Sequence, residues 1–476
     1  MLAFPLYLIF KKSLEEGIFP FKWKTSFVNP IFKDGDRALI TNYRPISLIS
    51  PIANLFESVI YLKLINQVAP KLSPHQHGFI PGKSVVTNLL DLADQVTEAF
   101  ERGCQVDAVY LDMTKAFDSI DHCLLLSKLN DIGFNNSLLA WFKSYLEDRY
   151  QLVYINGVYS KKFKATSGIL QGSRLGPLLF AIFINDIVLE TSCSLISLFA
   201  DDCRISRVVS NLQEVSTMQS DLDRISQWIT RNKLEINVKK CSKISFSRSH
   251  SVLDTHYLIG DQLIHNTNTV RDLGVILDVK WTFNDHLNYL LPKSFKTLGY
   301  IKRLTFNFTS LPVINYLFKT LILPGLTYAS VIWSLSTQDK FSELNSILTK
   351  FLRFAAFKNG TPMKFDNHNY SSISSICNLH KLESIHHYHD VSFVLENLRG
   401  KLKSNIFDNR FQLRELTYHL RNHRPYKEFT HKNNYIAHSP SYRLVERWNA
   451  IDPELRATLI TGSDKDPLKT SCLNLF

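Results

Sequence analysis

The sequence has few cysteines, and they form no recognisable pattern. Its seven cysteines are scattered and odd in number, with no Cys-x-x-Cys motif and none beside a histidine pair at metal-ligand spacing. This argues against a disulfide-rich secreted fold and against a zinc knuckle, and it indicates reduced thiols in a reducing compartment. The cluster His386, His387 and His389 also lacks metal spacing, so we expect a polar helix face there.

Long apolar runs are missing as well. The apolar stretch Met1 to Phe10 is too short to span a bilayer, and its lysines follow the run instead of preceding it as in a signal peptide. We therefore expect this stretch to be the first helix of a fold, with no membrane partner. The sequence shows no internal repeat and no low-complexity segment, so a solenoid or a disordered linker is not expected.

Acidic residues are too few to balance the basic ones. The 476 residues include 43 acidic and 55 basic side chains, a formal net charge of +12. The basic excess recurs in three segments, Arg231 to Arg248, Lys293 to Arg303 and Arg399 to Lys432. Any one of them fits a solvated surface, but three separated segments fit a long polyanion better, and nucleic acid is the expected partner. With 45% hydrophobic residues, the chain has enough apolar material for two or three packed domains.

The stretch Leu195 to Val209 carries the strongest chemical signal. A short apolar run, two adjacent aspartates and a second, alternating run predict a β-hairpin with Asp201 and Asp202 at its tip. Paired carboxylates on a tight turn suit Mg²⁺ or Mn²⁺ better than zinc. Taken alone, the pair fits a plain hairpin turn better, since aspartate is common in turns.

A second acid follows another predicted strand. Val106 to Asp112 indicates a strand that ends on an acid, and a helix runs from the next loop to about Gly133. Asp118 and Asp121 are expected to cap that helix. The pattern predicts Asp112, Asp201 and Asp202 at neighbouring strand ends of an antiparallel sheet backed by helices, where they can share a metal pair.

Other segments are predicted from local signals. Gly17 to Pro45 is expected to form a hairpin that presents Lys33 and Arg44, and Ile46 to Val68 an apolar helix. An amphipathic helix from Val86 ends near Gly103 and should cover the sheet. Three further predictions are a hairpin at Leu152 to Ser160 with an Asn156-Gly157 turn, a glycine-rich loop leading into a helix at Gly168 to Phe180 with Pro177 as the first helical residue, and a helical bundle from His286 to about Gly400.

Five motifs occur in a fixed order: LDMTKAF, GILQGSRLGPLLF, FADD, NVKKCSKISF and DLGVILD. In this order they resemble the reverse transcriptases of non-LTR retrotransposons, the jockey-like LINE elements. The resemblance begins upstream at FPFKWKTSFVNPIFKDGD and NYRPISL and continues through Leu317 to Trp333. It covers nearly the whole chain to about residue 350.

The resemblance implies a right-hand polymerase fold, an α/β fold whose α+β palm has an antiparallel sheet. The expected parts are fingers (1–85), palm with interleaved fingers elements (86–260), a primer-grip hairpin (261–285), a helical thumb (286–400) and a basic C-terminal segment (401–476). It implies an RNA-directed DNA polymerase that uses an RNA template, a DNA primer and deoxynucleoside triphosphates. Two Mg²⁺ ions, replaceable by Mn²⁺, are expected as cofactors. The expected location is the nucleus.

The resemblance also implies roles for individual residues. Asp112, Asp201 and Asp202 match the metal-binding triad, and Lys240 matches a lysine that protonates the pyrophosphate leaving group. Leu273 and Gly274 match the primer grip. The nucleotide-binding positions are matched by Lys33, Arg44, Phe117, Gln171 and Gly172, with Phe117 beneath the sugar.

Some features depart from the family pattern. Ile169-Leu170 stands where Val-Pro is usual, so the loop loses a fixed φ angle and we expect Gln171 to be held less rigidly. Arg174 replaces an apolar residue and is expected to perturb the same pocket or to add a phosphate contact. We expect no upstream endonuclease, RNase H or zinc knuckle. The alternative interpretation is a catalytically idle nucleic-acid-binding relic of the same fold.

Overall fold

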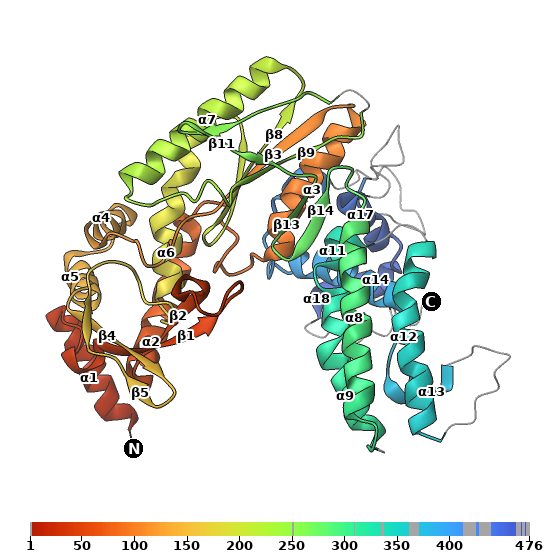
Figure 1. The fold of residues 1–476 in the computed structure, drawn as a ribbon, viewed down its shortest axis with the longest axis horizontal. Helices are drawn as coiled ribbons and strands as arrows, with labels where there is room; N and C mark the ends of the chain where they lie inside the picture. Colours follow the sequence, from red (N-terminus) through yellow and green to blue (C-terminus); the bar gives the residue numbers. More distant parts are fainter. Residues whose placement is uncertain are drawn as a thin grey trace.

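The computed structural model describes residues 2–249, 252–308, 310–334, 338–360, 371–412, 425–427, 439–462, 468 and 472. Its central sheet carries two arms that extend to the same side and leave a wide opening between them (Figure 1). The first arm is built mainly from the N-terminal third of the chain and the second from the helices that follow residue 283. This arrangement is the one that the right-hand fold implies.

The central sheet places the acids at one end of two neighbouring inner strands, β3 and β8. Its strand order is β12-β9-β3-β8-β7, antiparallel except for the pair β12-β9. The register pairs Leu111 with Cys203 and Phe199 with Asp202, so the end of β3 lies beside the start of β8. The strands are β3 (Gln105–Leu111), β7 (Leu195–Phe199), β8 (Asp202–Val209), β9 (Ser242–Phe246) and β12 (His265–Asn266).

The side chains of β3 alternate between two separate hydrophobic cores. Val106 and Ala108 join the core that includes α3 and the second arm, whereas Val109 and Leu111 join the core that includes α6 and α7. This alternation is what a strand with both faces covered requires. The covering helices are α3 (Val85–Glu101), α6 (Gly176–Ile184) and α7 (Leu212–Arg231).

The first arm holds the predicted cationic hairpin. β1 pairs antiparallel with β2 and parallel with β4. Asn156 and Gly157 both have positive φ, 49° and 86°, as the predicted type I′ turn requires. The elements are α1 (Ala3–Glu16), β1 (Thr25–Phe32), β2 (Tyr43–Leu48), α2 (Pro51–Val68), α4 (His122–Ile132), α5 (Asn136–Leu146), β4 (Arg149–Ile155), β5 (Val158–Tyr159) and β6 (Phe163–Ala165).

Two predicted boundaries in this half are wrong by a few residues. The stretch from Ile46 to Leu48 belongs to β2, and the apolar helix begins at Pro51, because these residues pair with β1. Gly176, not Pro177, is the first residue of α6. Proline is tolerated at either position of a first helical turn, since neither amide has an intrahelical partner there.

The second arm is helical, as predicted, and a hairpin joins it to the sheet. The hairpin is formed by β13 (Thr269–Asp272) and β14 (Val275–Asp278), and a small hairpin, β10 (Leu258–Ile259) with β11 (Gln262–Leu263), precedes it. The helices are α8 (Asn284–Leu304), α9 (Leu311–Leu321), α10 (Leu323–Thr327), α11 (Ser330–Trp333), α12 (Gln338–Lys358), α13 (Ser371–Cys377) and α14 (Leu382–Leu398).

The histidines of α14 do not form a polar surface, and that prediction is wrong. His386 is fully buried and lies within hydrogen-bond distance of the Leu326 carbonyl (3.0 Å) and the Ser334 hydroxyl (3.2 Å). His389 contacts the Ser330 hydroxyl at 2.9 Å. Burial lowers the pKa of His386 to about 3 and that of His387 to about 4. These side chains pack the arm in their neutral form.

Part of the C-terminal segment folds back onto α3, a helix that covers the sheet. Helix α17 (Pro440–Asn449) packs against α14 and α3, with α15 (Asn405–Arg410) and α18 (Pro453–Thr461) nearby. Arg443 and Arg447 both donate to the buried Asp390 carboxylate, at 2.7 and 2.8 Å. Residues 413–424 and 428–438 of the predicted basic segment lie outside the described residues. Among the described helices, none combines the length and apolar character needed to span a bilayer.

Candidate active site

One cavity gathers most of the predicted site residues. It has a volume of about 570 Å³ and opens between the first arm and the central sheet. The predicted residues that line it are Lys33, Arg44, Asp112, Phe117, Gln171, Gly172, Asp201 and Lys240. They come from five segments spread over more than two hundred positions of the sequence, so the fold, not local spacing, brings them together.

Asp112 and the Asp-Asp turn are positioned by the backbone of the sheet. Asp112 directly follows β3, and its backbone carbonyl accepts a hydrogen bond from the Asn237 amide at 2.9 Å. The turn between β7 and β8 contains Ala200, with a φ of 57°, followed by Asp201. Since β3 and β8 are neighbours, the three acids fall at one end of the sheet, as predicted.

The acids repel one another electrostatically. Both Asp201 and Asp202 can be reached by solvent, but they lie in a hollow surrounded by protein. Burial raises the pKa of Asp202 to about 6, and the carboxylates of Asp201, Asp272 and Asp112 add to this rise. Burial also raises the pKa of Asp201, with Asp112 adding to the rise and Arg44 and Lys33 opposing it. A cation bound among these carboxylates would relieve the repulsion.

The acids fit an open cation site more closely than a closed one. In the ranges that the structure describes, no three acidic, histidine or cysteine side chains are arranged to hold a metal ion by themselves. Mg²⁺ is usually held by one or two carboxylates together with waters and substrate phosphates, so it does not need a complete protein cage. The donor set of Asp112, Asp201 and Asp202, all hard oxygens, suits such an ion.

The Gln171-Gly172 loop is fixed on both sides. The Gln171 carbonyl accepts from the Ser47 amide at 2.7 Å, and its side-chain amide donates to both Asp118 oxygens, at 3.1 and 3.2 Å. Gly172 has a φ of 112°, and a Cβ there would meet the Ser47 carbonyl oxygen at 2.7 Å. The loop therefore needs glycine at this position, and contacts with β2 and Asp118 restrain Gln171 without a neighbouring proline.

Asp118 does not cap a helix, and the prediction for it is wrong. Asp121 alone caps α4, accepting from the amides of Cys123 and Leu124 at 2.9 and 3.0 Å. Asp118 instead lines the cavity and holds Gln171. Burial raises the pKa of Asp118, while its bond from Gln171 lowers it. No sequence signal pointed to this pair, because the two residues are 53 positions apart.

Phe117 lines the cavity and also packs against the core. Its ring stacks on Phe180 of α6, with centroids 4.4 Å apart and an angle of 11° between the rings. Phe79 meets it edge to face at 6.5 Å and lines the same cavity. The stacking fixes the orientation of the Phe117 ring at the cavity wall.

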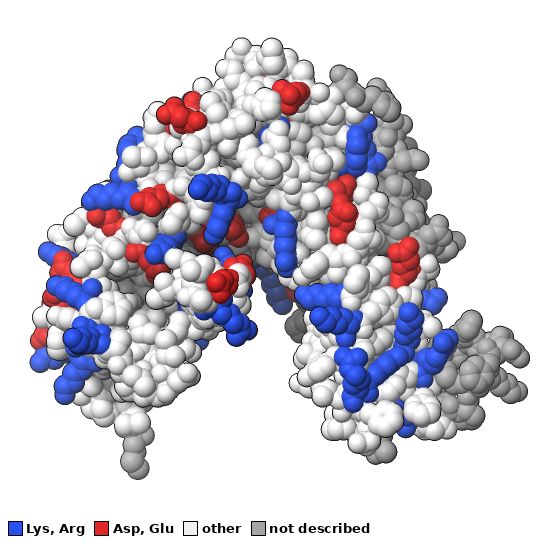
Figure 2. Space-filling view, in the orientation of Figure 1, with Lys and Arg blue, Asp and Glu red and all other residues white. Residues whose placement is uncertain are grey.

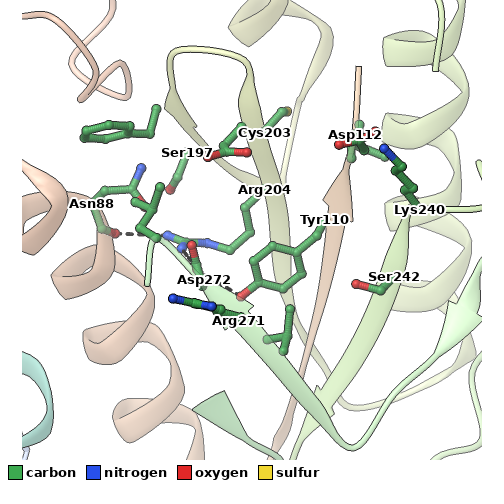
Figure 3. Close-up of a pocket in the computed structure, with 15 residues that line it drawn as sticks. Asn88, Tyr110, Asp112, Ser197, Cys203, Arg204, Lys240, Ser242, Arg271 and Asp272 are labelled. Atoms are coloured by element: carbon green, nitrogen blue, oxygen red, sulfur yellow. Dashed lines mark hydrogen bonds and ion pairs between the residues drawn. The ribbon is translucent and has the colours of Figure 1, made fainter. Parts of the chain in front are cut away.

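A second cavity, of about 190 Å³, joins the acids to the β13–β14 hairpin. Asp112 and Lys240 lie together at one end of it, and Tyr110 and Arg204 converge on Asp272 at the other (Figure 3). Arg204 and Asp272 form a buried ion pair, and the Tyr110 hydroxyl donates to Asp272 at 3.0 Å. This network ties the hairpin to the strands that carry the acids. No pattern in the sequence was taken to indicate this network, although an arginine inside an apolar strand was a usable signal.

The hairpin tip is also held by the second arm. Leu273 lines the smaller cavity beside Asp112 and Asp202, whereas Gly274 lines neither cavity. The Tyr328 hydroxyl donates to the Leu273 carbonyl at 2.8 Å. A Cβ on Gly274 would meet the Tyr328 ring at 3.1 Å, so the arm approaches the tip closely at that residue.

Arg174 does not line the cavity of about 570 Å³, so the expectation that it perturbs that pocket is wrong, whereas the phosphate contact stays a prediction. Together with Lys83 it lines a neighbouring cavity of about 710 Å³. Its backbone amide, like that of Leu175, donates to the buried carboxylate of Glu57, at 2.8 and 3.2 Å. Glu57 thus caps the start of α6, and burial raises its pKa. An acid within the apolar α2 sequence could have signalled this role.

Two of the basic segments, 231–248 and the one on α8, have different surroundings. In the segment 231–248, Arg231 pairs with Glu190 and Lys233 with Asp121, while Lys243 is buried. Arg231 and Lys233 thus pair with acids at the surface and Lys243 is part of the core, and the assignment of this segment to a polyanion stays a prediction. On α8 the lysines and arginine face outward, and Figure 2 shows Lys and Arg gathered on that arm beside the deep hollow between the arms.

The comparisons with known proteins agree with this geometry. Residues 31–301 match the family model described as reverse transcriptase (RNA-dependent DNA polymerase). Since this is more than half of the chain, the protein belongs to the reverse transcriptase family.

Relatives from Drosophila melanogaster confirm the similarity to jockey-like elements. The chain is 28% identical over 364 residues to the RNA-directed DNA polymerase from mobile element jockey, covering 73% of this chain and 39% of the relative. It is 27% identical over 356 residues to the probable RNA-directed DNA polymerase from transposon X-element, with the same coverage. The chain thus spans about two fifths of the length of these relatives. Among solved structures, apo telomerase from Candida Tropicalis shows a TM-score of 0.43 and 13% identity, covering 80% of this chain and 63% of that one.

Proposed function

We propose that this protein is an RNA-directed DNA polymerase that extends a DNA primer on an RNA template from deoxynucleoside triphosphates. The observation that carries the proposal is the cavity of about 570 Å³, where cations of the first arm face acids of the central sheet. Phosphoryl transfer depends mainly on positioning and on neutralising charge, and this arrangement supplies both. In this proposal the first arm acts as fingers, the sheet as palm and the second arm as thumb.

The cations suit a triphosphate. Lys33 follows β1 and Arg44 lies on β2, so the hairpin presents both to the cavity. Arginine can bind phosphate oxygens through two parallel hydrogen bonds, and lysine acts as a point charge. Lys240 lies across the cavity beside Asp112, where it can donate a proton to the pyrophosphate as it leaves.

Asp112, Asp201 and Asp202 are proposed to hold two divalent cations, Mg²⁺ or Mn²⁺. When bound, such a pair stabilises the attacking and leaving oxygens of an in-line displacement. Gln171 and Gly172 are proposed to form the cavity wall on which the nucleotide rests, and Phe117 is proposed to lie beneath the nucleotide sugar. Leu273 and Gly274 are proposed to position the primer end, with the β13–β14 hairpin fixed to the palm through Asp272.

The test is primer extension on an RNA template by the wild type and by Asp112→Asn and Asp201→Asn. We expect each variant to lose activity by roughly a thousandfold, about 4 kcal/mol of barrier, because a carboxylate charge is removed at the reacting phosphate. Affinity for the primer–template should change little, since the acids serve chemistry and not affinity. A wild-type protein that binds the primer–template but cannot extend it would favour the idle relic.

A further inference from the structure

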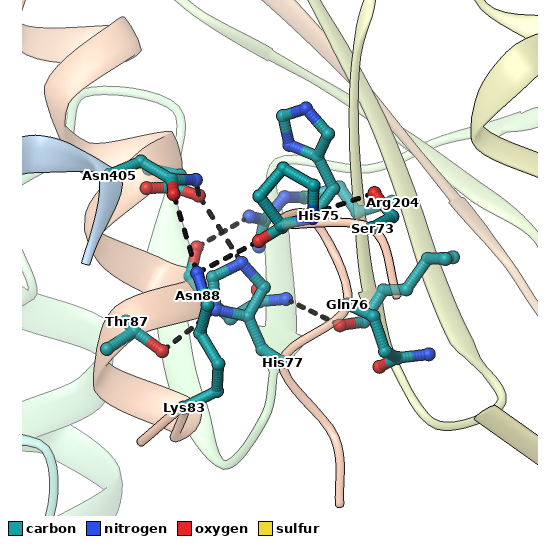
Figure 4. Close-up of polar contacts among 12 residues, drawn as sticks. Ser73, His75, Gln76, His77, Lys83, Thr87, Asn88, Arg204 and Asn405 are labelled. Carbon is teal, nitrogen blue, oxygen red and sulfur yellow. Dashed lines mark hydrogen bonds and ion pairs between the residues drawn. The ribbon is translucent and has the colours of Figure 1, made fainter. Parts of the chain in front are cut away.

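A short extended segment pairs with β7 beside the Asp-Asp turn. The His75 carbonyl accepts from the Leu198 amide at 2.9 Å, and the His77 amide donates to the Leu198 carbonyl at 2.8 Å. Gln76 thereby forms a parallel bridge with Leu198. Residues His75 to Gly78, called the brace here, cover the outer edge of the strand that leads into the turn (Figure 4).

The Gln76 side chain reaches the turn itself. Its Oε1 accepts hydrogen bonds from the Gly78 amide at 2.8 Å and from the Ala200 amide at 3.3 Å. The side chain is fully buried, and its Nε2 has no hydrogen-bond partner among the described residues. A buried donor without a partner costs about 1–3 kcal/mol. The two hydrogen bonds that Oε1 accepts offset this cost and hold the side chain in place.

Ala200 needs such support. Its φ of 57° is a left-handed conformation that is unfavourable for a residue with a Cβ, and such conformations persist when their surroundings restrain them. Ala200 directly precedes Asp201, so its conformation sets the direction in which the Asp201 carboxylate leaves the backbone.

Gly78 brings the brace into contact with the same turn. A Cβ at this position would lie 2.4 Å from the Ala200 nitrogen and 3.0 Å from the Phe199 carbonyl carbon. No larger residue fits without moving one of the two backbones. The close approach and the Gln76 bonds therefore fix the same peptide.

The other side of the brace is anchored. The His77 ring lies 2.8 Å from the Thr87 hydroxyl and 3.3 Å from the Asp91 carboxylate, both on α3. Asn405, from the C-terminal segment, donates to the same Asp91 carboxylate at 3.1 Å. Figure 4 shows His77, Lys83 and Asn405 gathered around this point of α3. The brace is thus part of the palm and not a loose loop.

We infer that Gln76 is a positioning residue that holds the Ala200 peptide and thereby aims Asp201 and Asp202. Gln76 lines neither the cavity of about 570 Å³ nor the cavity of about 190 Å³, so it acts through the turn and not on substrate. The inference rests on the proposed function for the role of the two acids. It does not depend on that function for the restraint on the turn.

The first test measures hydrogen exchange in peptides spanning the β7–β8 turn, on the full chain without substrate. Gln76→Met removes the acceptor and keeps the side-chain volume, and we expect faster exchange at the turn than in the wild type. The matched control is Gln95→Met, since the Gln95 side chain also accepts from β8, at Ser206 (2.5 Å), away from the turn. The control should leave exchange at the turn unchanged.

The second test separates kcat from KM in single-nucleotide extension. Gln76→Met should lower kcat about tenfold to a hundredfold, because misplacing a reacting group by about 1 Å has effects of this size. The nucleotide KM and primer–template affinity should stay within about twofold of wild type. Gln95→Met should leave kcat nearly unchanged.

The outcomes are distinguishable. Equal exchange at the turn in the two variants, or a kcat loss shared by both, overturns the inference. If Gln76→Met does not fold, the wild type decides, because the inference requires slow exchange of the Ala200 amide and fast exchange contradicts it. If the wild type extends no primer, the proposed function fails, while the exchange comparison still tests the restraint by Gln76.

Discussion

Two stretches of this protein are both basic in sequence, but their cations lie in different surroundings. In the segment 231–248, Lys243 is buried and donates to the Thr255 carbonyl and hydroxyl at 2.7 and 2.5 Å, and burial lowers its pKa. On α8, Lys302 lies near Lys350 and Arg353 of α12, and burial together with these like charges lowers its pKa. Lys243 thus helps to hold the fold together, whereas Lys302 lies among cations that repel one another.

This difference shows what a charge count omits. A cation that is paired with a carboxylate, as Arg231 is with Glu190, adds little net charge and attracts a polyanion only weakly. Cations gathered close together, as Lys302, Lys350 and Arg353 are, raise the local potential, and a polyanion that binds them releases counterions. We therefore expect α8 and its neighbours to contribute more to nucleic-acid affinity than Arg231 and Lys233.

Replacing the buried lysine should destabilise the fold strongly. Lys243→Met leaves the Thr255 carbonyl without its donor and Asp107 without a nearby cation, and we expect a loss of about 2–3 kcal/mol. Denaturant unfolding measures this loss. The control Lys296→Met, on the outward face of α8, should change stability by less than about 0.5 kcal/mol. Similar losses in both variants would remove the distinction between the two stretches.

Neutralising α8 should weaken nucleic-acid binding without harming the fold. In the triple variant Lys293→Gln, Lys296→Gln, Arg303→Gln, the slope of log affinity against log salt should fall by roughly 2, at about 0.7–0.9 per lost phosphate contact. Over a fourfold change in salt this is about a fifteenfold difference. Titration of a labelled primer–template measures it. The double variant Arg231→Gln, Lys233→Gln should keep the wild-type slope, and an equal fall there would contradict this expectation.

Phe117 combines a packing contact with a place in the site, since its ring packs on Phe180 and lines the cavity of about 570 Å³. If the ring leaves no room for a 2′-hydroxyl, Phe117→Val should narrow the preference for deoxynucleotides by about tenfold, chiefly through better ribonucleotide use. Single-nucleotide incorporation with each sugar measures this. A loss of activity on both sugars in equal proportion would show that Phe117 is a packing residue.

Local patterns determined a large part of this structure. The Asp201-Asp202 hairpin, the Asn156-Gly157 turn and the helix that Asp121 caps were all predicted, because turn and cap chemistry involves residues that are adjacent in the sequence. The order of five motifs was enough to indicate the family. The sequence also indicated many of the residues that line the cavity of about 570 Å³, namely Lys33, Arg44, Asp112, Phe117, Gln171, Gly172, Asp201 and Lys240.

Other features were decided by tertiary packing alone. Asp118 resembles a helix cap in sequence, but the loop that carries Gln171 takes its carboxylate. Gln76 lies 124 positions from Ala200, and no periodicity or spacing connects them. The lysines of residues 231–248 and α8 are alike until the fold supplies partners for some of them. Hydrogen bonds and ion pairs between distant segments depend on how those segments pack, and the composition of each segment does not contain that information.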